Sequence, residues 1–124
     1  MPTHYEIDCT NRLILSFATG TLTDDEMDAH RKRLAADPDF DPEYRQLADF
    51  RGVTRLEITT ARLREFAADN PWKKRTRRAF VCGSDEVFGM SRMFQLLTDG
   101  ASAEVGVFRD LEEARAWLGL DPLT

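Results

Sequence analysis

The chain has 124 residues, of which 42% are hydrophobic and 31% are charged, and its formal net charge is −5 at pH 7. This length and composition are typical of a folded globular chain, so we predict a single domain over residues 1–124. The acidic balance argues against general nucleic-acid binding, because such domains are usually basic. No run of about 18 apolar residues occurs, so no transmembrane helix is expected.

Targeting and cysteine usage favour a cytoplasmic protein. The first residues carry acids early and lack the apolar segment of a secretory signal. Cys9 and Cys82 have no metal-ligand spacing, and two free thiols are expected rather than a disulfide. A peripheral contact with a membrane stays open at this stage.

The first part of the chain predicts a hairpin and a helix. Residues 4–8 alternate weakly, a polar turn follows, and residues 13–17 form a clearer strand that ends near Gly20. Thr23 and Glu26 have the spacing of a capping box, which predicts a helix over 24–36. The inward stripe of this helix is thin, and its expected members are Met27, His30 or Arg31, and Leu34.

The stretch 46–60 predicts the central strand of the fold. Leu47, Ala48 and Phe50 form a short apolar run, with Asp49 and Arg51 at its end. Gly52 is expected to allow a sharp turn. Threonine hydroxyls then stand where a helix begins. A strand, a shaped loop and a helix N-terminus in this order are typical of ligand or switch sites in open α/β sheets.

The remaining chain repeats the alternation of strand and helix. We predict a helix over 60–69, a strand over 79–82, a helix capped by Ser84, a strand over 104–108 and a helix capped by Asp110. The element order is therefore β-β-α-β-α-β-α-β-α. It predicts an α/β fold with a single mixed, mostly parallel sheet of four or five strands and about four helices. The opening hairpin should add one antiparallel strand at an edge.

These residues resemble a known family. The element order, and the run 47–53 leading through 57–60 into a helix, resemble the STAS fold of anti-sigma-factor antagonists. Four phrases are similar to the SpoIIAA-like group of small bacterial proteins: residues 20–23, 37–42, 88–94 and 108–114. The resemblance implies a non-enzymatic binding or regulatory module that engages a protein partner or a small ligand.

The antagonist branch of that family also implies a switch residue. There a serine at the start of the second helix is phosphorylated by a partner kinase. An ungapped match places Ile58 at this position, and a shift of one residue places Thr59 there. A phosphate on Thr59 or Thr60 would meet the free N–H groups of a helix N-terminus. The alternative is that one of these threonines is simply the N-cap.

Two groups of residues are candidates for the site. The first is a switch or ligand-loop group at the ends of two strands and the start of a helix, which could take a small apolar or anionic ligand: Asp49, Arg51, Thr59, Thr60, Gly83 and Ser84. The second is a membrane or partner surface made of the basic tract and one helix: Trp72, Lys73, Lys74, Arg75, Arg77, Arg78, Phe88 and Met90.

Each member of the second group has an alternative role. The basic tract with Trp72 could bind an anionic membrane or an acidic partner, or it could be a solvated connection with Trp72 folded back onto the core. The Phe88–Phe94 helix could bind a lipophile or form a homodimer face, or it could pack in the core. The runner-up function is thus a peripheral membrane or lipophile-binding protein.

Catalysis has little support in the sequence. His4 and His30 are far apart, and His30 is placed on a polar helix face. Neither cysteine has a histidine nearby in sequence, and no zinc spacing or nucleophile elbow occurs. We therefore expect no enzyme activity, no cofactor and no metal.

Overall fold

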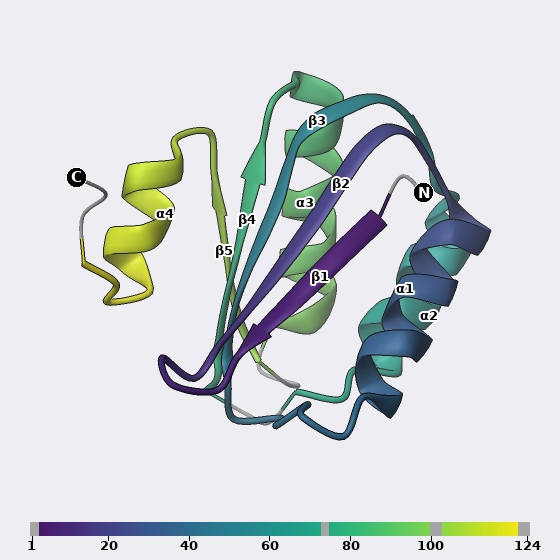
Figure 1. Ribbon diagram of the computed structural model, residues 1–124. Coiled ribbons are helices and arrows are strands. Elements are labelled where there is room, and N and C mark those ends of the chain that lie inside the picture. The colour runs from purple at the N-terminus through teal and green to yellow at the C-terminus, as the bar shows by residue number, and fades with distance from the viewer. Residues whose placement is uncertain (1–2, 73–74, 100–102, 122–124) are drawn as a thin grey trace.

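The computed structural model describes residues 3–72, 75–99 and 103–121, and its elements follow the predicted order (Figure 1). Each helix joins two strands or follows the last one. The bounds are β1 Thr3–Asp8, β2 Leu13–Thr23, α1 Asp24–Ala36, β3 Arg45–Glu57, α2 Thr60–Ala68, β4 Arg77–Cys82, α3 Asp85–Thr98, β5 Glu104–Phe108 and α4 Leu111–Trp117.

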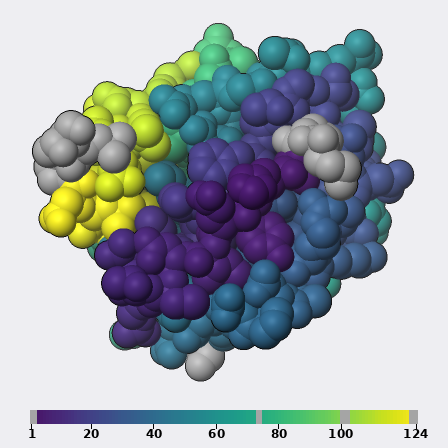
Figure 2. Space-filling model, in the orientation of Figure 1, coloured from purple at the N-terminus to yellow at the C-terminus, as the bar shows by residue number. Residues whose placement is uncertain are grey.

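One mixed sheet carries the fold, as predicted. Its strand order is β1-β2-β3-β4-β5. β1 pairs antiparallel with β2 at the edge, and the other three pairings are parallel. In the space-filling view β1 lies on the near surface, with α1 to its right and α4 to its left (Figure 2). The α/β class and the antiparallel edge strand are both confirmed.

The prediction of a sharp turn at Gly52 was wrong. β3 continues through this residue to Glu57, and β2 likewise continues past Gly20 to Thr23. The two strands stay paired along this length, with register shifts between Phe17 and Thr19 and again after Gly20. A Cβ at Gly52 would lie 2.7 Å from Cγ2 of Thr19, so the glycine allows the close approach of two strands rather than a turn.

The long strands create an overhang. Pairing of β3 with β4 ends at Phe50 and Cys82, whereas pairing of β3 with β2 continues to Glu57. The far part of β2 and β3 is therefore a two-stranded ribbon, and α1 and α2 begin at its end (Figure 1).

Helices cover both faces of the sheet. α4 packs on one face against a cluster that includes Leu13, Leu47 and Val81. α1, α2 and α3 cover the other face (Figure 1). The buried clusters beneath these helices include Ile14, Ala48 and Phe80. Neighbouring residues of one strand thus serve opposite layers, as the period of two requires. We call these the α4 face and the three-helix face.

The helix starts follow the capping chemistry in the sequence. The Thr23 hydroxyl accepts a hydrogen bond from the Glu26 N–H at the start of α1, and the Ser84 hydroxyl accepts one from the Val87 N–H at the start of α3. The Asp110 carboxylate accepts a hydrogen bond from the Glu112 N–H at the start of α4. All three caps were predicted.

Candidate functional site

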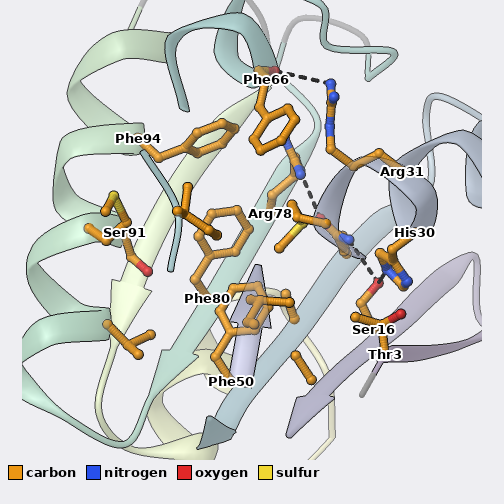
Figure 3. Close-up of a pocket in the computed structure, with 18 of the residues that line it drawn as sticks. Thr3, Ser16, His30, Arg31, Phe50, Phe66, Arg78, Phe80, Ser91 and Phe94 are labelled. Atoms are coloured by element: carbon orange, nitrogen blue, oxygen red, sulfur yellow. Dashed lines mark hydrogen bonds between the residues drawn. The ribbon is translucent and has the colours of Figure 1, made fainter. Parts of the chain in front are cut away.

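A cavity of about 90 Å³ lies between the sheet and the helices of the three-helix face (Figure 3). Its lining is mostly apolar and comes from β2, β3 and β4 together with all three covering helices. The apolar members include Ala18, Leu34, Ala48, Phe50, Leu63, Phe66, Phe80, Met90 and Phe94.

Polar side chains interrupt this apolar lining toward the N-terminal ends of the strands. Ser16, Gln46 and Arg78 stand on three neighbouring strands, and all three are buried. Gln46 lies beside Arg78 in the register of β3 and β4. Because each residue occupies an inward position, the pleat of the sheet directs all three toward the cavity.

The polar residues form one chain of hydrogen bonds (Figure 3). Nε of Arg78 donates to Oε1 of Gln46 at 2.8 Å. Nε2 of Gln46 donates to Oγ of Ser16 at 3.0 Å. Oγ of Ser16 lies 3.2 Å from Nε2 of His30. An arginine can only donate, so it fixes the direction of the Gln46 amide.

Arg78 is a buried cation held among aromatic rings. Its side chain is 7% exposed, and its guanidinium carbon lies 4.0 Å from the ring centre of Trp72 and 5.3 Å from that of Phe80. Burial and, to a smaller extent, the nearby charge of Arg31 lower the pKa of Arg78 from its ordinary value to about 9. The guanidinium therefore stays charged at neutral pH and is costly to keep in this place.

His30 ends the chain as a neutral imidazole. The side chain is 6% exposed, and burial, with a smaller contribution from Arg33, lowers the pKa of His30 from 6.5 to about 4. Its Nδ1 is buried and has no hydrogen-bond partner within the described ranges. Of the two placements left open for His30, the inward stripe is confirmed and the polar helix face was wrong, because α1 turns this residue toward Ser16 and the ring of Tyr5.

The predicted loop residues lie together in part. Asp49 and Arg51 form an ion pair of 2.8 Å, and with Phe17, Ala18, Thr19 and Gly52 they border a shallow open depression. Gly83 touches the same strand, because a Cβ there would lie 2.6 Å from the Arg51 carbonyl oxygen. Ser84 is the N-cap of α3. These residues shape the junction between β3 and β4.

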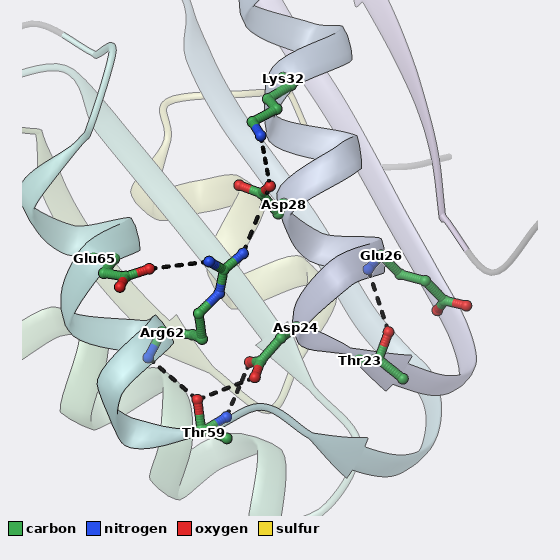
Figure 4. A network of polar contacts seen from close by, with 8 residues as sticks. All are labelled: Thr23, Asp24, Glu26, Asp28, Lys32, Thr59, Arg62 and Glu65. Atoms are coloured by element: carbon green, nitrogen blue, oxygen red, sulfur yellow. Dashed lines mark hydrogen bonds and ion pairs between the residues drawn. The ribbon is translucent and has the colours of Figure 1, made fainter.

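Thr59 belongs to a different part of the molecule (Figure 4). Its hydroxyl accepts from the Arg62 N–H and donates to Oδ2 of Asp24 at 3.0 Å, and its own N–H donates to Oδ1 of Asp24. The N-cap alternative therefore holds for Thr59. A phosphate on Thr59 would lose both hydroxyl contacts and would face the Asp24 carboxylate. Phosphorylation of the exposed Thr60 stays a prediction.

The basic tract does not form one surface. Trp72 is buried, with Nε1 donating to the Tyr44 carbonyl, and Arg78 is buried beneath it. Trp72 is therefore folded back onto the core, which is the second of the two predicted roles for this residue. Arg75 and Arg77 are exposed, while Lys73 and Lys74 lie outside the described residues. A membrane-seated tryptophan with clustered cations does not fit this arrangement.

The predicted Phe88–Phe94 helix is part of α3, and its large apolar side chains mainly pack toward the interior. Met90 is half-buried and lines the cavity, and Phe88 is half-buried with the Arg109 guanidinium 4.3 Å from its ring centre. The exposed large apolar side chains on α3 are Met93 and Leu96.

Sequence reasoning did not identify the polar residues of the cavity as a group. Ser16 and Gln46 were not singled out, Arg78 was assigned to a surface or a solvated connection, and His30 was left between the inward stripe of its helix and a polar face. The alternation of side chains along the strands could have indicated these residues. In β2, β3 and β4 the polar residues share a face with Ile14, Ala48 and Phe80, which are buried. Polar residues at inward positions of buried strands are rare and call for an explanation.

The sheet order and the helices on both faces define an α/β module of the STAS type. A sequence profile of the SpoIIAA-like family matches residues 13–119, and the chain belongs to this family. A crystal structure of an uncharacterized protein of the DUF3478 family with a SpoIIAA-like fold, from Shewanella loihica PV-4, has the same fold. It is 20% identical, with a TM-score of 0.59, and the match covers 94% of this chain and 93% of that one. No curated protein matches the chain.

The SpoIIAA-like fold fits a regulatory or binding module. None of the described helices has the length and apolar character needed to cross a membrane. Within residues 3–72, 75–99 and 103–121, no cluster of three or more potential metal-ligating side chains is found.

Proposed function

We propose that this protein is a non-enzymatic binding module that holds a small apolar molecule in the cavity of the three-helix face. The observation that carries the proposal is the cavity itself, about 90 Å³ of space lined mostly by apolar side chains. Protein interiors are usually packed without voids of this size. Apolar cavities of comparable size stay dry and accept small apolar molecules.

The Ser16–His30 contact does not support catalysis. A serine nucleophile requires a histidine that takes its proton, and a third group that stabilises the resulting imidazolium. His30 has a pKa lowered to about 4 by burial, so it is a poor base near neutral pH. Its Nδ1 has no partner in the described part of the chain. The contact is better explained as the end of a buried hydrogen-bond chain.

Filling the cavity tests the proposal. Ala48 lines the cavity and is 1% exposed, so Ala48→Leu should occupy the space that a ligand would use. Ala116→Leu, on the exposed side of α4, adds the same atoms away from the cavity. Titration of the wild type with benzene and hexan-1-ol, followed by amide chemical shifts, should perturb residues of α1, α2 and α3.

Saturable shifts in the wild type and in Ala116→Leu, and their loss in Ala48→Leu, would support the proposal. Absence of saturable binding of both probes to the wild type would refute it.

A further inference from the structure

The charge inside the cavity specifies the ligand further. We propose that the natural ligand is a compact apolar carboxylic acid, bound as its anion, and that its carboxylate pairs with the guanidinium of Arg78. This inference rests on the proposed function, because it concerns the same cavity. It adds the chemical class of the ligand and the residue that recognises it.

The first argument is that no aspartate or glutamate supplies a counter-charge to Arg78. Every aspartate and glutamate of the sequence lies in the described residues, and none of them forms an ion pair with Arg78. A buried charge is normally paired. An uncompensated cation that lines a cavity is therefore the expected partner of a bound anion.

The second argument is that Gln46 satisfies one donor of the guanidinium but not its charge. Oε1 of Gln46 accepts from Nε of Arg78, and the amide nitrogen is used by Ser16. No hydrogen bond from the two terminal nitrogens of Arg78 to a described residue is found. A carboxylate is the acceptor that matches a guanidinium in shape, because its two oxygens can accept parallel hydrogen bonds.

The third argument sets the size and the charge of the ligand. The cavity is small and mostly apolar, and the described polar groups near Arg78 are already engaged: Nε1 of Trp72 with the Tyr44 carbonyl, and the Arg31 guanidinium with the carbonyls of Phe66 and Asp69. A phosphate would require several further donors. One negative charge on a short apolar body fits the lining better.

Calorimetric titration at pH 7 with matched pairs tests the inference. The pairs are butanoate with butan-1-ol, hexanoate with hexan-1-ol, and benzoate with benzyl alcohol. In each pair the apolar body is closely similar and the charge differs. We expect at least one acid to bind the wild type roughly 10- to 100-fold more tightly than its alcohol, the range of a charge-assisted hydrogen bond.

Three variants assign that preference to Arg78. Arg78→Met removes the charge and should abolish the preference for the acid. Gln46→Glu places a carboxylate beside Arg78. This carboxylate should pair with the guanidinium and so abolish the preference for the acid while the arginine is kept. Arg77→Met makes the same chemical change at the neighbouring residue, which is exposed and donates to the Trp117 carbonyl, and should leave the preference intact.

The outcomes separate the two proposals. Equal affinity of acid and alcohol in the wild type overturns the role of Arg78 and leaves the apolar site standing. A preference for the acid that survives both Arg78→Met and Gln46→Glu also overturns it. Binding of neither member of any pair overturns this inference, and the proposed function falls with it if benzene also fails to bind the wild type.

Discussion

The two faces of the sheet are built from the same strands, but the layers that pack against them differ in how completely apolar side chains fill them. The α4 face is a continuous apolar layer in which Leu13, Leu47 and Val81 pack against Ala114 and Leu118. The three-helix face has a cavity and, toward the N-terminal ends of its strands, a chain of buried polar side chains. Since alternate residues of the same strands produce both, one layer can supply stability while the other is free to carry a site.

The largest effect is expected on the α4 face. Leu47 is 4% exposed in the cluster beneath α4. Leu47→Ala should lower the free energy of unfolding by about 2–5 kcal/mol, because it removes buried methyl groups and leaves a void in a filled layer. Urea denaturation measures this change. A loss below about 1 kcal/mol would show that the α4 face is not packed as described.

The next effect is a pH dependence of stability that arises on the three-helix face. His30 has a folded-state pKa of about 4, below its ordinary value of 6.5. The unfolded chain therefore takes up a proton that the folded protein does not. The stability associated with neutral His30 is complete above pH 6.5 and is lost as the pH falls from 6.5 to 4. The loss is about 3 kcal/mol in total.

Denaturation at a series of pH values measures the His30 contribution. His30→Gln keeps a hydrogen-bonding group for Ser16 and should flatten the slope between pH 6.5 and 4. His4→Gln, at the exposed β1 position, is the matched control for loss of an imidazole. An unchanged slope in His30→Gln would contradict the buried, neutral state of this histidine.

A smaller gain is expected from pairing the buried cation. Gln46→Glu should raise the free energy of unfolding by roughly 1–2 kcal/mol, because the new carboxylate would accept a charge-assisted hydrogen bond from a guanidinium that is already desolvated. Thermal unfolding measures the gain. A clear decrease in melting temperature would mean that the charge of Arg78 is already compensated in the folded protein.

The smallest effect concerns the border between α1 and α2. Thr59→Ala removes the N-cap of α2 and the contact with Asp24, and should cost about 1 kcal/mol. Thr60→Ala, at the exposed neighbouring position, should change stability little. Chemical denaturation of the two variants side by side is the measurement, and equal losses would remove the special role of Thr59.

The elements could be predicted because their signals are local. Thr23, Ser84 and Asp110 mark helix starts by chemistry that acts within one turn. The full length of β3 could not be predicted, because Gly52 looks the same in a turn as beside another strand, and only pairing with β2 decides between them. The cavity could not be predicted either, since it depends on contacts among Ser16, Gln46 and Arg78 that are distant in sequence.

The overhanging ribbon of β2 and β3 has a mechanical consequence. It carries α1 on one strand and α2 on the other, and the polar bridge from Asp24 to Thr59 ties the two helices where they begin (Figure 4). If the ribbon bent at the register shifts near Thr19 and Gly20, α1 and α2 would move away from α3 together. The cavity of the three-helix face would then open without any helix unwinding, and amide exchange in the two helices would rise in step.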